Sequence, residues 1–494
     1  MKNHLTSLRA YVDALSELGD LREFDEEVDP DLEVGAVIRH GVENRLPAQL
    51  FNRLRGYPSG QRILGAPGAL SSLSGAPWAR VALSLGLGPH TRPLDLVEHL
   101  ATALEAKPVP PVTVSEAPCQ EYVLLGPDAS LDALPVPLVH AGDAGRYINT
   151  WGILVVRSPD GAWTNWAITR VMAAGSRQLV VMINPPQDIG KIYARWKQRG
   201  EPMPAALVQG AEPAIPFAGG MALPSGCDEA GFLGGWFGEP LQVVRCRTVD
   251  LEVPATAEIV VEGTVSLDET LPEGPMGEFY GYISGQPRER PVFDVTAVTH
   301  RHDPILPVVS AGKPVEEVHT VVGPTHSAEV LRNLRMAGLP VTAVWLVPEA
   351  SCTVAAVTVP REWRQWGGGI HTTTRMLTRA IAGVVLRPKV GFWLTRVLVL
   401  DDDIDPTDLR DLSWGLATRC HPVAGQVLFE DQLFTPLHIN YTPEEFRTLS
   451  GPKMAYDCLL PPDAERRPVS TAFAQNFPQH IKDRALGLWH GTAR

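Results

Sequence analysis

Apolar residues recur at intervals of three and four along residues 5–18. They are Leu5, Leu8, Tyr11, Val12, Leu15 and Leu18. This spacing predicts an amphipathic helix at the start of the chain, ended by Gly19-Asp20. Residues 32–44 and 93–106 predict two further short helices among Pro/Gly loops, and residues 108–111 predict a stiff connector. Residues 1–125 are therefore expected to form an N-terminal α/β segment.

From about residue 130 the apolar pattern becomes one of strands. Residues 152–157 form a short apolar run, residues 158–161 have the composition of a turn, and residues 162–172 alternate, which predicts a hairpin. Further strands are predicted at 179–183, 206–208, 241–245, 257–262 and 293–298, with a helix at 189–199. Many strands with Gly/Pro turns and few helices favour a β-barrel-like domain over residues 126–312.

After Pro314 helices and strands alternate, which predicts a separate α/β domain with its own sheet. Strands are expected at 341–347, 353–359 and 394–400, and helices at 327–337, 371–382, 407–417 and, in the tail, 477–489. The expected division is 1–125, 126–312, a linker at 313–330, 331–475 and 476–494, and the fold class is mixed α+β. The acidic run at 401–405 ends a strand before a helix, so we interpret it as capping that helix rather than binding a metal.

Length, charge and cysteine content narrow the class of protein. A chain of 494 residues is too long for one core, so two or three domains are expected. The net charge of −13 disfavours nucleic acid and anionic membranes as partners, and no apolar run is long enough to span a bilayer. The N-terminus has no apolar signal core, and the six cysteines contain no CxxC pair. These features predict a cytoplasmic protein.

Two carboxylates flank a Gly-Pro-Met-Gly turn in the stretch 271–281. Glu273 and Glu278 stand on either side of it. Glycine permits positive φ and close approach to a ligand, and proline stiffens the bend, so the turn can hold two acid/base groups in a cleft. The alternative is a surface turn with two solvated glutamates.

Polar side chains elsewhere could join this loop. Asn165 and Arg170 lie on one predicted strand, five residues apart, so a regular strand would put them on opposite faces and a bend would be needed for both to serve one site. Asp188 ends the next strand region, and Glu229 follows a glycine-rich turn. Amide and carboxylate oxygens suit Mg²⁺ or Mn²⁺ better than zinc.

Three strings together resemble the UbiD family. They are Asn165-Trp-Ala-Ile-Thr-Arg170, Asp228-Glu-Ala-Gly231 and Glu273-Gly-Pro-Met-Gly-Glu278, supported by strings at 251–260, 317–320 and 414–419. Members of this family are reversible decarboxylases that use prenylated FMN. The chain is most similar to the branch of ferulic/cinnamic acid and pyrrole-2-carboxylate decarboxylases. The resemblance implies a split-barrel flavin domain at 126–312 and a C-terminal oligomerisation domain.

The resemblance also implies roles for individual residues. Arg170, Glu273 and Glu278 would form the catalytic network, with Glu278 as proton donor and Glu273 paired with Arg170. Asn165 and Glu229 would bind Mn²⁺ or Mg²⁺ beside the cofactor phosphate, and Asp188 stands where the family normally has a histidine ligand. The cofactor-binding residues would be Asn165, Ala167, Ile168, Gln187, Gly220, Met221 and Lys453. A K⁺ ion is expected near Trp166 and Met221, and Gly219 and Gly220 stand where relatives often have serines.

Substrate and partners follow from the same resemblance. The pocket residues would be Phe279, Val318, Val322 and Phe473. Two valines offer no polar partner to a pyrrole or phenol, so an apolar α,β-unsaturated acid is favoured. Expected partners are further copies of the chain, in a homodimer or higher homo-oligomer, and a flavin prenyltransferase that supplies the cofactor. His319 is interpreted as a packing or capping residue. Two alternatives stay open: a flavin-independent, metal-dependent lyase or hydrolase, and a non-catalytic flavin-binding scaffold.

Overall fold

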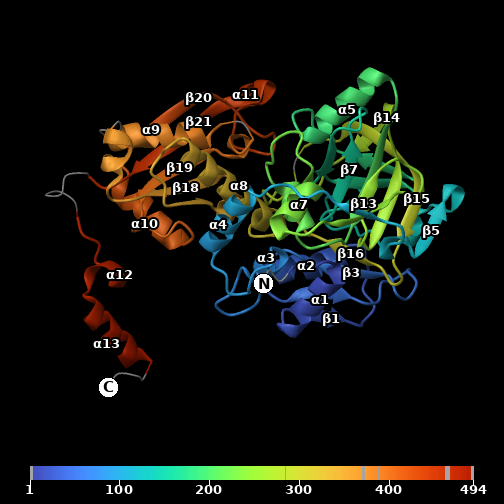
Figure 1. The fold of residues 1–494 in the computed structure, drawn as a ribbon, viewed down its shortest axis with the longest axis horizontal. Helices are drawn as coiled ribbons and strands as arrows, with labels where there is room; N and C mark the ends of the chain where they lie inside the picture. The colour runs from blue at the N-terminus through green and yellow to red at the C-terminus, as the bar shows by residue number, and fades with distance from the viewer. Residues whose placement is uncertain (1–3, 284, 370–372, 388, 462–467, 491–494) are drawn as a thin grey trace. The chain divides into compact units, whose positions relative to one another are not determined.

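The protein is mixed α+β and divides into two compact units. The computed structural model describes residues 4–283, 285–369, 373–387, 389–461 and 468–490. The first unit comprises Met1–Glu329 with Pro348–Cys352, and the second comprises Val330–Val347 with Thr353–Arg494. Figure 1 shows the elements of each unit by label and colour. Among the described residues, no helix combines the length and apolarity needed to cross a membrane.

The N-terminal part of the first unit has a small mixed sheet covered by helices. Its strands, in spatial order, are β1 (Leu21–Phe24), β2 (Ala48–Phe51), β3 (Arg62–Gly65) and β16 (Ile305–Val308). Its helices are α1 (Leu8–Glu17), α2 (Glu33–Glu43), α3 (Ala79–Ser84) and α4 (Pro93–Ala103). The predicted apolar face of α1 is buried against this sheet, and Ser7 caps the helix by accepting a hydrogen bond from the Ala10 amide. The predicted α/β character of this segment is therefore confirmed.

A nine-stranded sheet forms the centre of the first unit. Eight strands follow one another in space: β6 (Tyr147–Asn149), β9 (Val171–Gly175), β10 (Gln178–Val181), β15 (Arg288–His300), β14 (Ile259–Glu273), β11 (Met203–Gln209), β7 (Ile153–Arg157) and β8 (Thr164–Ala167). The ninth, β5 (Tyr122–Leu125), pairs with β15. β14 and β15 form a long antiparallel hairpin, much longer than the strands predicted at 257–262 and 293–298.

The sheet must curl on itself because of one short connection. β8 lies at one end of the strand order and β9 is next to the other end, yet only residues 168–170 join them. A segment of that length spans at most about 14 Å between Ala167 and Val171, so the two ends of the sheet approach each other. The predicted split-barrel character is thereby confirmed. The prediction of one continuous strand over 162–172 is wrong, because the chain leaves β8 and enters the opposite end of the sheet.

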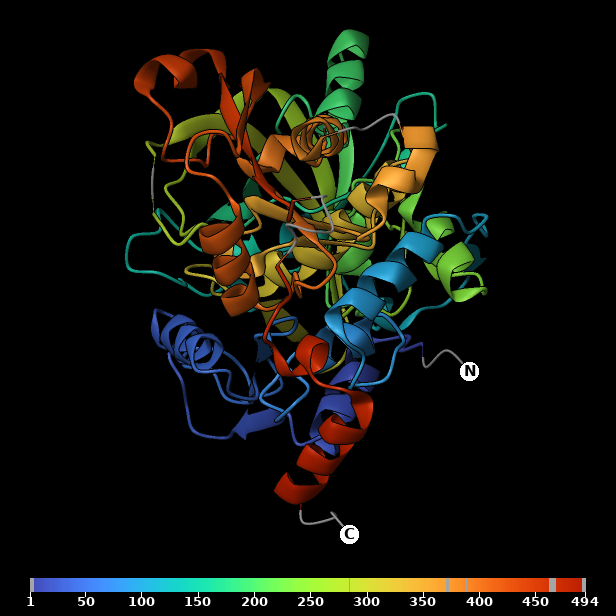
Figure 2. The same cartoon turned by 90° about the vertical axis from the view of Figure 1, so that its left-hand side faces the viewer.

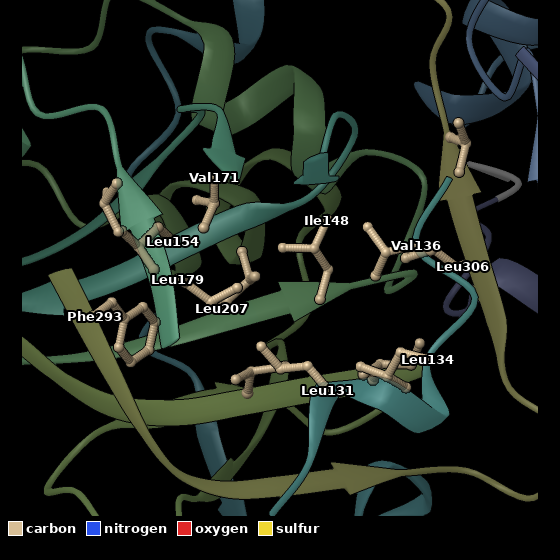
Figure 3. Packing of buried hydrophobic residues seen from close by; sticks show 14 of the residues in the cluster. Leu131, Leu134, Val136, Ile148, Leu154, Val171, Leu179, Leu207, Phe293 and Leu306 are labelled. Carbon is tan, nitrogen blue, oxygen red and sulfur yellow. The ribbon is translucent and has the colours of Figure 1, made fainter. Parts of the chain in front are cut away.

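Apolar side chains fill the inside of the curl. Figure 3 shows Leu154, Leu179, Leu207 and Phe293 pointing toward a common interior from four different strands. Ile148 and Val171 lie in the same cluster, and every one of these side chains is buried. Burial of each such side chain stabilises the folded state by about 1.5–3 kcal/mol. The packed interior therefore keeps the strands, and the polar residues at their ends, in a defined geometry.

Helices and a small sheet complete the first unit. They are α5 (Asp188–Arg199), α6 (Ile215–Gly220), α7 (Glu229–Phe237), α8 (Glu317–Met336, which continues into the second unit) and the strands β13 (Glu252–Pro254), β12 (Gln242–Arg245) and β4 (Val112–Val114). Figures 1 and 2 show α5 as the green helix. The helix predicted at 327–337 begins ten residues earlier, at Glu317. Pro324 lies inside α8.

The second unit is a five-stranded sheet with helices, as the alternating pattern predicted. Its strands, in spatial order, are β17 (Ala343–Leu346), β18 (Val354–Val359), β19 (Arg396–Asp401), β21 (Ser450–Cys458) and β20 (Gln426–Leu433). Its helices are α9 (Thr374–Val385), α10 (Leu409–Arg419), α11 (Pro443–Thr448), α12 (Phe473–Asn476) and α13 (Gln479–Trp489). Part of the helix predicted at 371–382 lies outside the described residues, at 371 and 372.

The acidic run at 401–405 has a structural role that differs from the predicted one. The N-cap of α10 is Asp408, which accepts from the Arg410 amide. Asp403 instead binds Arg419, the last residue of α10, with both oxygens at 2.8 Å from guanidinium nitrogens. The buried Asp401 accepts from the Leu460 amide. The prediction that this run caps the helix is therefore wrong.

Candidate active site

The bend at 168–170 is fixed by buried hydrogen bonds. The Asn149 side-chain amide donates to the Thr169 carbonyl at 2.6 Å, and its oxygen accepts from the Gly152 amide and from Gln209. The Thr169 hydroxyl donates to the Met182 carbonyl. Because both the nitrogen and the oxygen of the Asn149 side chain are hydrogen-bonded, they tie the bend to neighbouring strands. It supplies the change of direction that Asn165 and Arg170 would need to serve one site.

Arg170 leaves this bend between two carboxylates. Its Nη2 donates to Glu273 Oε2 at 3.0 Å, and its Nε lies 2.8 Å from Glu273 Oε1. On the other side its Nη1 donates to Glu278 Oε1. Glu273 is 1 % exposed, so the alternative of a surface turn with solvated glutamates is wrong. The structure brings together the three residues predicted to be catalytic.

The loop between the two glutamates holds them apart by backbone geometry. Gly274 has φ of +87°, which a residue with a side chain adopts only with strain. A Cβ on Gly277 would lie 2.5 Å from the ring of His140, so the close approach there requires glycine. The Gly277 amide donates to Asp143 at 2.7 Å, and the Glu278 amide donates to the Tyr282 carbonyl.

Sequence reasoning missed two residues of this network, Tyr147 and Asp143. The Tyr147 hydroxyl donates to Glu273 Oε1 at 2.7 Å in a fully buried contact. Asp143 holds the Gly277 amide and lies 3.1 Å from His140 Nδ1. The polar tip of Tyr147 within a short apolar strand, and the Gly-Asp-Ala-Gly string around Asp143, were the signals available in the sequence.

Burial and charge shift the pKa values of the network. Burial raises the pKa of Glu278 above its usual value, although the nearby Arg170 cation opposes the shift. Burial lowers the pKa of Arg170, but Glu278 and Glu273 outweigh it, so the net pKa is raised. Burial, followed by the Glu273 charge, raises the pKa of Tyr147. A glutamic acid that keeps its proton beside a fixed cation can act as a general acid.

A second polar centre joins Asn165 to Glu229. The Asn165 side-chain amide donates to Glu229 Oε1, and the Trp166 backbone amide donates to Oε2, both at 2.9 Å. Glu229 begins α7, and Asp228 caps that helix. Burial raises the pKa of Glu229 to about 8, against the opposing effect of these hydrogen bonds. A buried carboxylate with only neutral partners is a strong potential ligand for a cation.

Asp188, the third predicted metal ligand, begins α5 and makes other contacts. Its Oδ1 accepts from Lys191 Nζ at 2.7 Å and from the Ser225 hydroxyl at 2.8 Å. Within the described part of the chain, no group of three or more His, Cys, Asp or Glu side chains is arranged to hold a metal ion. The structure thus brings Asn165 and Glu229 together, and the assignment of Asp188 as a ligand stays a prediction.

Most of the predicted cofactor residues of the first unit lie around the bend. Ala167 and Met221 are buried, whereas the Ile168 side chain is 38 % exposed. A Cβ on Gly219 would lie 3.3 Å from Ile168, and one on Gly220 would lie 2.6 Å from Val321. Gln187 Oε1 is buried and has no hydrogen-bond partner among the described residues. An unpaired buried oxygen and an exposed apolar side chain are groups that the polar edge and the planar face of a ring system such as a flavin could contact.

The predicted substrate residues of the first unit gather at the start of α8. Val318 and Val322 are half-buried one turn apart on one helix face. Phe279, beside Glu278, packs its ring against the edge of His319 with centroids 5.6 Å apart. His319 is buried in the first turn of α8, not before the helix, and its Nδ1 accepts from the Glu316 amide. This contact fits the packing interpretation of His319.

Lys453 and Phe473 belong to the second unit. Lys453 lies on β21, is buried, and donates to the Gly391 carbonyl. Burial lowers its pKa to about 8. Phe473 is 44 % exposed on α12, where it contacts Phe477. Both roles stay predictions.

Comparison with known proteins identifies three family domains along the chain. The N-terminal, Rift-related and C-terminal domains of UbiD, the 3-octaprenyl-4-hydroxybenzoate carboxy-lyase, match residues 12–104, 111–314 and 319–458. The pyrrole-2-carboxylic acid decarboxylase of Pseudomonas aeruginosa is 38 % identical over 491 residues, which cover 99 % of this chain and 98 % of that one. Ferulic acid decarboxylase 1 of Saccharomyces cerevisiae is 34 % identical over 497 residues, with the same coverage.

Solved structures agree with these sequence relatives. The UbiD-class enzyme HmfF from Pelotomaculum thermopropionicum, in complex with FMN, has a TM-score of 0.79 and 28 % identity, covering 94 % of this chain and 97 % of that one. An evolved dimeric form of HmfF, in complex with prFMN, has a TM-score of 0.78 and 28 % identity, covering 97 % and 100 %. The open form of Sedimentibacter hydroxybenzoicus vanillic acid decarboxylase has a TM-score of 0.83 and 25 % identity, covering 99 % and 98 %.

Proposed function

The chain belongs to the UbiD family of carboxy-lyases, and from that premise we propose that it is a prenylated-FMN-dependent, non-oxidative decarboxylase of an α,β-unsaturated carboxylic acid. Similarity to decarboxylases and to structures solved with FMN and prFMN supports the cofactor. The observation that carries the proposal is the Arg170 guanidinium held between Glu273 and Glu278.

The residues around the bend suit the cofactor. When bound, prenylated FMN supplies the electron sink that loss of CO₂ from an unsaturated acid requires. The residues of the first unit that would hold it are Asn165, Ala167, Ile168, Gln187, Gly220 and Met221. Asn165, Glu229 and Asp188 would hold Mn²⁺ or Mg²⁺, whose charge balances a phosphate beside acidic groups. K⁺ near Trp166 and Met221 is part of the same proposal.

The protein's own side chains have three tasks. Arg170 binds the substrate carboxylate with its planar fork and orients the double bond. The apolar side chains Phe279, Val318 and Val322 exclude water, which favours release of neutral CO₂. Glu278 then gives its proton to the carbon that has lost CO₂, and it regains a proton from solvent before the next turnover. Glu273 holds Arg170 in place through two contacts.

Substrate class and partners extend the proposal. The two valines of α8 give the pocket apolar walls that offer no hydrogen-bond partner. The pocket therefore favours an apolar alkenyl or aryl acid over one whose N–H or O–H would be buried unpaired. We further propose a homodimer or higher homo-oligomer formed through the C-terminal domain; an evolved form of HmfF is dimeric. A flavin prenyltransferase would supply the cofactor in the cytoplasm. The five-part division at 125, 312, 330 and 475 is part of this proposal.

Glu278→Gln tests the proposal in protein co-expressed with a flavin prenyltransferase. We expect CO₂ release from a cinnamic-type acid to fall about 10²–10⁴-fold, because the amide cannot donate the proton. Flavin absorbance of the purified protein should be unchanged, which separates loss of chemistry from loss of cofactor. Glu269→Gln, an exposed substitution on the same strand as Glu273, is the control. Wild-type decarboxylation by flavin-free protein would contradict the proposal.

A further inference from the structure

The segment that precedes β6 lies alongside the loop that leads to Glu278. The Ala144 amide donates to the Pro275 carbonyl at 2.8 Å, and the Gly277 amide donates to Asp143 Oδ1 at 2.7 Å. The second contact lies one residue before Glu278 in the chain. Asp143 therefore holds the backbone from which the Glu278 side chain projects.

Asp143 is a buried carboxylate, with 1 % of its side chain exposed. Its Oδ1 accepts from Gly277, and its Oδ2 lies 3.1 Å from both the backbone nitrogen and the ring Nδ1 of His140. Among the described residues, no lysine or arginine forms an ion pair with it. An ionised carboxylate only accepts hydrogen bonds, so this set of donors fits the charged form. A buried charge of this kind is screened less than an exposed one.

The Asp143 charge acts on the proton donor. Burial is the largest cause that raises the pKa of Glu278, and the Arg170 cation opposes it. The charges of Glu273, Glu316 and Asp143 add to the effect of burial, because a like charge disfavours the ionised form. Of these three carboxylates, Asp143 is the one whose hydrogen bond also fixes the backbone next to Glu278.

We propose that Asp143, held by His140, is a positioning residue of the proton donor: it fixes the backbone beside Glu278, and its charge favours the protonated form of Glu278. The inference rests on the proposed function. When Glu278 gives its proton to the carbon that has lost CO₂, it becomes a carboxylate near the Asp143 charge. The repulsion between them favours uptake of a proton from solvent, which restores the acid before the next turnover.

Asp143→Asn tests the charge, because its amide oxygen can still accept from Gly277. We measure kcat for a cinnamic-type acid across pH in protein co-expressed with a flavin prenyltransferase. At the acidic end kcat should stay within about twofold of wild type, because Glu278 is protonated in both proteins. The alkaline loss of activity should begin at lower pH, so that kcat there is about three- to tenfold below wild type. KM should be unchanged, since Arg170 is untouched.

Asp143→Ala tests the position, because it removes the acceptor of the Gly277 amide as well as the charge. We expect kcat to fall by a further factor of about ten at the acidic end, where the charge has no effect, since Glu278 is no longer held in place. The same kcat in Asp143→Ala and Asp143→Asn at that end would overturn the positioning role.

Infrared spectroscopy measures the ionisation of Glu278 directly, in flavin-free protein. The C=O stretch of its protonated carboxyl is the band that is present in wild type and absent in Glu278→Gln. In Asp143→Asn this band should disappear at lower pH than in wild type. This titration needs no turnover, so it tests Asp143 separately from the proposed function. A protein that releases no CO₂ with bound prenylated FMN would overturn the proposed function, whereas unequal infrared titrations would still support the charge effect of Asp143.

Two control variants separate charge from packing. His140→Gln removes the imidazole beside Asp143 but keeps the carboxylate, so its alkaline limb should not move to lower pH. Asp160→Asn changes an exposed carboxylate that accepts from the Ala162 amide at 3.2 Å, and it should behave as wild type. Identical pH profiles and infrared titrations in wild type and Asp143→Asn would overturn the charge effect. An equal downward shift in His140→Gln would also overturn it, because loosened packing would then suffice.

Discussion

Two buried acidic centres of the first unit differ in how their charge is balanced. Glu273 and Glu278 have Arg170 between them, so this centre contains its own cation. Glu229 has a side-chain amide from Asn165 and a backbone amide from Trp166 but no cation among the contacts described, and burial raises its pKa to about 8. The first centre already has the cation that balances its carboxylates. The second centre has no balancing charge until Glu229 binds a cation or a proton.

The difference indicates a division of labour. A carboxylate held by an internal arginine stays in place whatever else is bound, which suits a group that must meet the substrate at a fixed distance. A carboxylate balanced only by neutral donors gains most from an external cation, which suits a centre that must recruit one. Substitutions that remove the balancing group should therefore affect the two centres in different ways.

The largest effect is expected from Arg170→Met. It removes the cation from two buried carboxylates, so activity should fall below detection, by at least about 10⁴-fold, and the folded state should lose about 3–5 kcal/mol. Steady-state CO₂ release and chemical denaturation measure the two effects. Arg177→Met, which removes an exposed arginine from the loop between β9 and β10, should be near wild type. Activity in Arg170→Met within tenfold of wild type would show that another group binds the carboxylate.

An intermediate effect is expected from Glu229→Gln, and it depends on pH. In metal-free protein the pKa of Glu229 is raised from 4.5 to about 8. The folded state therefore keeps a proton that the unfolded chain loses over this window, so stability falls as pH rises from about 4.5 to about 8. In Glu229→Gln the loss of unfolding free energy across this pH window should be smaller by an amount on the order of 4 kcal/mol.

Denaturation of both proteins at pH values across that window measures the difference. Mn²⁺ should restore the stability of the wild type at the upper end of the window but leave Glu229→Gln unchanged. Identical pH profiles for the two proteins would show that Glu229 ionises freely in the folded state.

The smallest effect is expected from Tyr147→Phe. It removes the hydroxyl that donates to Glu273 but leaves both contacts of Glu273 with Arg170. Stability should fall by about 1–3 kcal/mol and kcat by less than about tenfold. Tyr193→Phe is the control, because this α5 hydroxyl donates to the Ser266 carbonyl on β14 rather than to Glu273. A loss of activity as large as that of Arg170→Met would give Tyr147 a role in the chemistry itself.

The sequence alone predicted the elements whose periodicity is local. The amphipathic spacing of residues 5–18 and the alternation of strands and helices after Pro314 depend on neighbours within one turn or one strand, and α1 and the second sheet agree with them. The strings around Arg170 and Glu273 indicated the family because each string is contiguous in the chain. Patterns of this kind can be recognised without knowledge of long-range contacts.

Only the tertiary structure decided how those strings meet. The bend at 168–170 exists because Asn149, a residue from another strand, binds the Thr169 carbonyl, and no local pattern predicts a contact of that range. Tyr147 contacts Glu273, which is 126 positions away in the sequence, and no local pattern predicts this contact either. The sequence therefore determined which side chains are available. The closure of the sheet determined which of them come into contact and balance one another's charge. That division follows from physics: propensity and periodicity act over a few residues, whereas burial and electrostatics act through space.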